Sequence, residues 1–222
     1  NERVSSEDRS VLVTVDEWLS AEVSPDDLPP REGPCILGVD LGGSRSMSAA
    51  AFYWPDTGRI EAVGTFPAMP SLLERGGADG VSGRYVEMQD RGELSVLGEN
   101  TVPPGPWLAS LTRLIEGVEI TCIVGDRFRH AEFVEAMNKA GLRVPFMWRG
   151  FGWKDGSEDI ERFRRALFDG EVKVAPSLLL RSAFADAVCL RDPANNLKLA
   201  KARSTGRIDA AAASILAVAE GA

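Results

Sequence analysis

The sequence has 222 residues, of which 44% are apolar and 26% are charged, and its formal net charge at pH 7 is −8. This length suits one domain with its own core, with or without an extension. No apolar run approaches the roughly 20 residues of a membrane span, so no membrane partner is expected. The negative charge argues against a protein that coats nucleic acid generally, but it leaves room for a local basic track.

The first half of the chain predicts a lead-in followed by a strand meander. Residues 1–31 are polar, with "SPDDLPPREG" near their end, and we interpret them as a lead-in or linker with a short apolar patch at 11–18. The apolar stretches 35–40, 48–54 and 59–66 predict three strands. Turn sequences separate them, which is typical of an antiparallel meander.

The second half alternates helical and strand patterns. The glycine-containing stretch 70–94 predicts short helices, and Ser157 is the expected N-cap of one longer helix. Longer helices are expected over 105–117, 129–141, 156–170, 177–189 and 206–221, and strands over 119–126 and 144–148. This order indicates an α/β fold, in which a mostly buried central sheet has helices on both faces.

Two of the expected strands share one design. "ILGVD" and "CIVGD" are apolar runs with one glycine, and they end in Asp40 and Asp126. If the two strands are parallel neighbours, their carboxylates meet at one sheet edge, where sites form in open α/β sheets. Carboxylates that close repel each other unless cations hold them. Oxygen ligands alone favour Mg²⁺ or Mn²⁺.

A third carboxylate, Asp209, opens the alanine-rich last helix. Packing of that helix on the sheet would bring Asp209 to the strand ends. Arg207 and the helix N-terminus both favour its ionised form. Each acid alone has a structural interpretation, as a turn residue, a helix cap or a partner of the helix dipole, but the combination is harder to explain that way.

Three blocks of the sequence resemble the nuclease domain of tailed-phage terminase large subunits. They are "CILGVDLGGSRSMSAAAFYW", "ITCIVGDRFRHAEFVEAMNKAG" and "DPANNLKLAKARSTGRIDAAAASILAVAEG". The resemblance implies an RNase H-like fold for residues 32–222, with a mixed sheet of five or more strands flanked by helices. It also implies that residues 1–31 lead in from an ATPase motor. The chain has no GxxxxGK[ST] loop, so the motor itself is not expected here.

The resemblance also implies an activity and its residues. The family's three acids fall on Asp40, Asp126 and Asp209, which would bind two Mg²⁺ or Mn²⁺ ions and hydrolyse phosphodiester bonds of concatemeric double-stranded DNA. Asp40 would bridge the two ions, and the other two acids would each hold one. The implied partners are DNA, the motor domain, the small terminase subunit and the portal, in the host cytoplasm. Ser46 stands where many members have a further Asp, so a metal-binding or water-positioning role there is not expected.

Basic residues beside these acids are candidates for contacts with DNA phosphates. They are Arg45, Arg127, Arg129, Lys198, Lys201, Arg203 and Arg207. The last four form a track that leads to Asp209, which predicts cutting with little sequence preference. A solvated basic face is the structural interpretation of the same track. His130, the one histidine, suits a helix start better than a phosphate contact.

Three other interpretations remain open. A resolvase or transposase of the same fold would prefer branched DNA. "GVDLGG" followed by Ser also resembles the first phosphate loop of sugar kinases and actin-like ATPases, but those need a second such loop and a longer chain. A non-enzymatic interaction module on a nuclease scaffold is disfavoured because all three acids are present.

Overall fold

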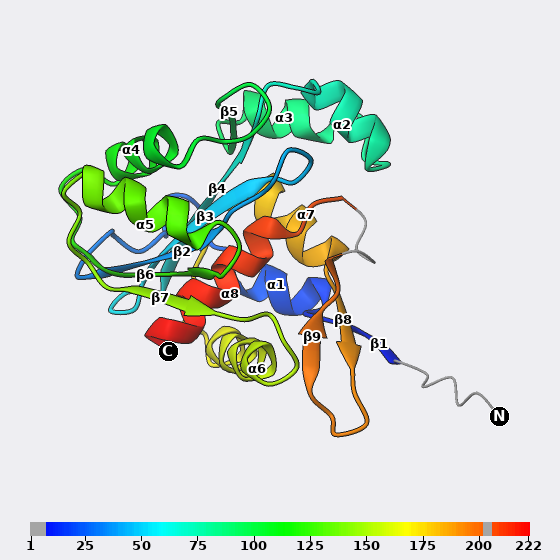
Figure 1. Ribbon diagram of the computed structural model, residues 1–222. Helices are drawn as coiled ribbons and strands as arrows, with labels where there is room; N and C mark the ends of the chain where they lie inside the picture. The colour runs from blue at the N-terminus through cyan, green and yellow to red at the C-terminus, as the bar shows by residue number, and fades with distance from the viewer. Residues whose placement is uncertain (1–7, 202–205) are drawn as a thin grey trace.

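The computed structural model describes residues 8–201 and 206–222, which form two sheets and the helices around them (Figure 1). Within these residues the larger sheet is mixed and six-stranded, in the order β5-β4-β3-β2-β6-β7. Its strands are β2 (Cys35–Asp40), β3 (Ser48–Trp54), β4 (Arg59–Phe66), β5 (Leu94–Val96), β6 (Ile120–Asp126) and β7 (Phe146–Arg149). The antiparallel β2–β3–β4 meander confirms the sequence prediction.

A smaller three-stranded sheet lies beside it in the described chain, in the order β1-β8-β9. Its strands are β1 (Asp8–Val11), β8 (Val188–Arg191) and β9 (Leu197–Leu199). The helices are α1 (Val15–Ala21), α2 (Leu72–Ala78), α3 (Arg84–Asp90), α4 (Pro104–Leu114), α5 (His130–Lys139), α6 (Asp155–Phe168), α7 (Leu178–Asp186) and α8 (Asp209–Gly221).

Helices cover both faces of the large sheet, as the continuous apolar strands predict. Every residue of β2 and β3 is buried. Because side chains alternate along a strand, Ile36 faces the core beneath α8, whereas Leu37 and Val39 pack with Trp107 of α4 and Phe133 of α5. In Figure 1, α8 lies across the sheet on one side, and α4 and α5 lie together.

The contact between α8 and β2 is unusually close. A Cβ atom built on Gly38 would lie 2.1 Å from the carbonyl oxygen of Ala213 and 3.0 Å from the Cβ of Ala217. Glycine in the strand and alanines in the helix therefore let the two backbones approach. This close packing fixes the N-terminus of α8, and with it Asp209, relative to the end of β2.

The structure adds detail to one local expectation and corrects another. Part of the expected lead-in is folded, because β1 pairs with β8 and Trp18 of α1 stacks on Phe184 at a centroid distance of 4.2 Å. The boundary near residue 31 itself stays a prediction. Ser157 does not cap α6, which begins at Asp155; its hydroxyl oxygen instead accepts a hydrogen bond from the Leu197 amide at 2.9 Å.

No helix within the described ranges is long and apolar enough to cross a bilayer.

The Gly38 contact gives a first prediction. Gly38→Ala should lower the free energy of unfolding by about 1–3 kcal/mol or more, because the added methyl group meets backbone atoms of α8 that cannot move aside. Gly77→Ala is the matched control, since a Cβ there has no neighbour within 4 Å and alanine suits a helix better than glycine. Urea unfolding of both variants measures the difference. Equal stability of the two variants would show that α8 does not press on β2.

Candidate metal centre

Asp40 and Asp126 lie at adjacent strand ends. The strands β2 and β6 are parallel, with Val39 opposite Gly125, so the two aspartates follow at the same edge of the sheet. This arrangement confirms that the two apolar runs are parallel neighbours. Asp40 is 2% exposed, whereas Asp126 is half-buried.

The chain after Asp40 turns back at once into β3. The Gly42 amide donates to the Ser48 hydroxyl at 3.0 Å, and a Cβ on Gly42 would lie 2.5 Å from the Ser46 carbonyl oxygen. Glycine is therefore required by close backbone approach in this turn. The buried guanidinium of Arg75 donates to the carbonyl oxygens of Ser44 and Arg45, which fixes the far side of the loop.

Asp209 comes to the same edge of the sheet from the helix α8. It is the first residue of α8 and is 5% exposed. The segment before it is anchored by Arg207, whose Nε and Nη2 each donate to a carboxylate oxygen of Asp79 at 2.8 Å. The Tyr85 hydroxyl donates to the same carboxylate at 2.7 Å.

One ammonium group joins two of the three acids. Lys201 Nζ donates to Asp40 Oδ2 and also to Asp209 Oδ1, the second at 3.2 Å. The Lys201 side chain is 38% exposed, and its ammonium lies 5.2 Å from the centroid of the Phe151 ring. Two buried carboxylates thus share one cation at the edge of the sheet.

Burial is the main influence on the pKa of Asp40. It raises that pKa to about 7; Lys201 opposes the rise, and the charges of Asp209 and Asp126 add to it. For Lys201, burial acts to lower the pKa, but Asp40 and Asp209 outweigh it and raise the pKa above its usual value. The ammonium therefore offsets only part of the cost of burying the Asp40 carboxylate beside the other acids.

The three acids do not form a ready-made three-ligand cluster. Over residues 8–201 and 206–222, no three Asp, Glu, His or Cys side chains lie close enough together to hold one metal ion. The structure joins Asp40 and Asp209 through Lys201 and places Asp126 on the neighbouring strand.

The residues nevertheless fit divalent cations. Asp40 and Asp209 are buried carboxylates with hard oxygen donors, and they already face one shared positive group. Asp40, Asp126 and Asp209 are the residues that would hold such ions.

The expected DNA-contact residues divide into two groups. Arg45 and Arg127 are exposed, and Lys198 is partly exposed. Arg129 instead donates to the Gly42 carbonyl and to Glu132, so it supports the loop after β2. Arg207, bound to Asp79, likewise serves the fold, and Arg203 lies outside the described residues.

Aromatic rings accompany several of the basic groups. The Arg127 guanidinium lies 4.1 Å from the centroid of the Trp148 ring, and Lys198 Nζ lies 5.5 Å from that of Trp153. His130 stacks on Trp148 at 6.0 Å, and its Nδ1 lies 2.9 Å from the Arg127 carbonyl oxygen. The histidine thus belongs to the local structure at the start of α5.

Sequence reasoning missed two residues that organise this site. Arg75 and Asp79 belong to a glycine-containing stretch with no distinctive pattern. Their partners lie far away in the sequence, so no local signal could identify them.

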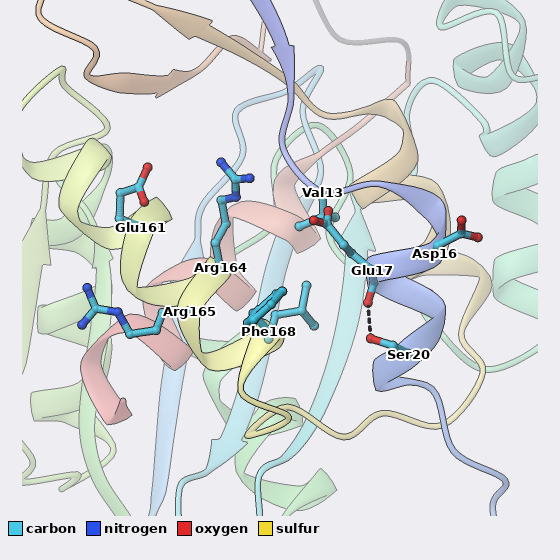
Figure 2. A pocket seen from close by; sticks show the side chains of 9 residues that line it. Val13, Asp16, Glu17, Ser20, Glu161, Arg164, Arg165 and Phe168 are labelled. Atoms are coloured by element: carbon cyan, nitrogen blue, oxygen red, sulfur yellow. Dashed lines mark hydrogen bonds between the residues drawn. The ribbon is translucent and has the colours of Figure 1, made fainter.

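A separate cavity of about 580 Å³ lies between α1 and α6 (Figure 2). Figure 2 shows Arg164 and Phe168 of α6 on one side and Glu17 of α1 on the other. None of the three candidate acids lines this cavity, so its volume does not bear on the metal centre.

Comparison with known proteins gives consistent results. The chain matches the family described as terminase large subunit, endonuclease domain, over residues 3–222. It is 29% identical over 111 residues to the terminase large subunit of Enterobacteria phage HK97, covering 50% of this chain and 22% of that protein. The crystal structure of the HK97 large terminase matches with a TM-score of 0.82 at 22% identity, covering 96% of this chain and 44% of that one.

A second solved structure aligns with this chain over almost the full length of both chains. The large terminase nuclease from thermophilic phage G20c with bound magnesium gives a TM-score of 0.59 at 14% identity, covering 95% of this chain and 97% of that one. A further G20c nuclease structure holds cobalt. By contrast, this chain spans less than half the length of the HK97 proteins that it matches.

The six-stranded mixed sheet and its flanking helices have the fold of the large terminase nuclease structures, which confirms the RNase H-like α/β fold class expected from the sequence. The match over nearly the whole chain makes the assignment more specific. The chain belongs to the family of terminase large subunit endonuclease domains.

The raised pKa of Asp40 predicts a pH-dependent stability difference. Its folded pKa of about 7 exceeds the unfolded value of 3.8, so its contribution to stability is present below about pH 4 and is lost as pH rises towards 7. In EDTA, Asp40→Asn should therefore gain stability relative to the unsubstituted chain between about pH 4 and 7, and the difference should level off above that.

Thermal unfolding of both proteins across this range measures the difference. A stability difference that does not change with pH would show that burial does not raise the pKa of Asp40.

Proposed function

We propose that this chain is a divalent-metal-dependent endodeoxyribonuclease that cuts concatemeric double-stranded viral DNA during genome packaging. The observation that carries the proposal is the pair of buried carboxylates, Asp40 and Asp209, which share one cation beside the strand end of Asp126. Family membership supports the same reaction. Two Mg²⁺ or Mn²⁺ ions are the proposed cofactors.

Each of the three acids has a proposed role in binding the ions. Asp40, at the end of the central strand β2, would bridge the two ions, and Asp126 and Asp209 would each hold one. Such ions supply a nucleophile at neutral pH and stabilise the charge that develops on the leaving oxygen. The chain's own contribution is rigidity, because β2, β6 and α8 fix the carboxylates from three directions.

Substrate binding is assigned to basic groups at the same edge. Arg45, Arg127 and Lys198 have exposed or partly exposed side chains and no salt bridge among the described residues, which makes them suitable for backbone phosphates. These groups offer no pattern for reading base edges, so cutting with little sequence preference is expected. Lys201 and Arg203 extend the proposed track.

The larger assembly is part of the proposal. A chain that spans less than half the HK97 large terminase suits a nuclease portion that works with an ATPase motor domain. Residues 1–31 would lead in from that motor, and residues 32–222 would form the nuclease. The small terminase subunit and the portal are the further partners, and the infected host's cytoplasm is the proposed location.

The test uses supercoiled plasmid, with Mn²⁺ or Mg²⁺ and with EDTA. The chain should cut the plasmid only when the metal is present. Asp40→Asn, Asp126→Asn and Asp209→Asn should each remove a metal ligand. Each should therefore lose more activity than the roughly 10–100-fold that is typical of replacing a residue that only hydrogen-bonds to a metal ligand.

Asp159→Asn is the matched control. Asp159 is as buried as Asp40, but its salt-bridge partner is Arg149 and not Lys201, so its variant should keep metal-dependent cutting below its unfolding temperature. Cutting that persists in EDTA, or in the three site variants, would refute the proposal.

A further inference from the structure

Lys201 donates to carboxylate oxygens that metal binding would also require. Its ammonium meets Asp40 Oδ2 and Asp209 Oδ1, and both carboxylates are almost fully buried. Mg²⁺, for example, would need these oxygens at about 2.0–2.1 Å. An ammonium group and a divalent ion at such close range would repel each other strongly.

We propose that Lys201 is the internal counter-ion of this site, and that a divalent ion binds by displacing it. Before the ion binds, the ammonium holds Asp40 and Asp209 together against their mutual repulsion. After the exchange, Lys201 is free for a DNA phosphate. This inference rests on the proposed function only for the identity of that phosphate, because the exchange itself concerns the metal and the lysine alone.

Among the basic residues of this stretch that the structure describes, Lys198 and Arg207 have other partners, which singles out Lys201. Lys198 lies over the Trp153 ring, and Arg207 is bound to Asp79. Lys201 lies two residues after the end of β9 and binds Asp40, which is 161 positions earlier in the sequence. One basic track thus contains a ring-stacked lysine, a counter-ion and a structural arginine.

The exchange couples metal binding to DNA binding. A phosphate that attracts Lys201 weakens its hold on the carboxylates, so DNA should raise the affinity for metal. By linkage, metal should raise the affinity for DNA by the same factor. The coupling should shrink when Lys201 is replaced by an uncharged residue.

The first test compares Lys201→Met with the unsubstituted chain. Electron paramagnetic resonance of free Mn²⁺, without DNA, should show about tenfold tighter Mn²⁺ binding in the variant, within the range usual for coupled sites. Thermal unfolding in EDTA should show a lower Tm. Lys198→Met is the matched control, because it removes a nearby charge that does not touch the carboxylates, and its Mn²⁺ affinity should change far less.

Unchanged or weaker Mn²⁺ binding by a folded Lys201→Met variant would overturn the proposal, as would an equal gain in Lys198→Met. Should Lys201→Met not fold, lysine ammonium NMR signals of the unsubstituted chain provide the test. One signal should be protected from exchange in EDTA and should lose that protection in saturating Mg²⁺; persistence of protection would contradict the exchange. A chain that binds Mn²⁺ in this way but cuts no DNA would refute the proposed function alone.

Discussion

The close packing of α8 on β2 is the constraint on which the site depends. Gly38 has no side chain, and the facing helix presents Ala213 and Ala217, so the helix lies almost on the strand backbone. That contact brings Asp209 to the end of β2, where Asp40 is equally buried. The packing of α8 on β2 thus holds the Asp40 and Asp209 carboxylates close together, although their like charges repel each other.

The charge gathered in this way requires a cation, and the fold supplies one of its own. Lys201 bridges the two acids, yet burial and the other carboxylates still raise the pKa of Asp40 to about 7. An internal lysine offsets only part of the cost, and a divalent ion would offset more. The buried carboxylates that destabilise the metal-free protein would therefore favour the binding of a divalent ion. Functional sites in many proteins lower stability in this way.

Much of this arrangement was predictable from the sequence. The runs that end at Asp40 and Asp126 are uniformly apolar, a pattern typical of strands buried on both faces, and parallel strands bring their carboxyl ends together. The β1–β8 pairing was not predictable, because these four-residue strands come from opposite ends of the chain. The bridging role of Lys201 and the Asp79–Arg207 pair likewise depend on contacts between residues far apart in the sequence. Ser157 was predicted to cap a helix, but its hydroxyl oxygen accepts a hydrogen bond from the distant Leu197 amide.

A crystal of the chain soaked in Mn²⁺ and measured for anomalous scattering tests the central claim most directly. We expect anomalous peaks between Asp40, Asp126 and Asp209, with Asp40 in contact with both ions and the Lys201 ammonium moved off the carboxylates. A fully occupied Mn²⁺ site elsewhere on the molecule, with Lys201 still bridging Asp40 and Asp209 and no peak between the acids, would contradict it.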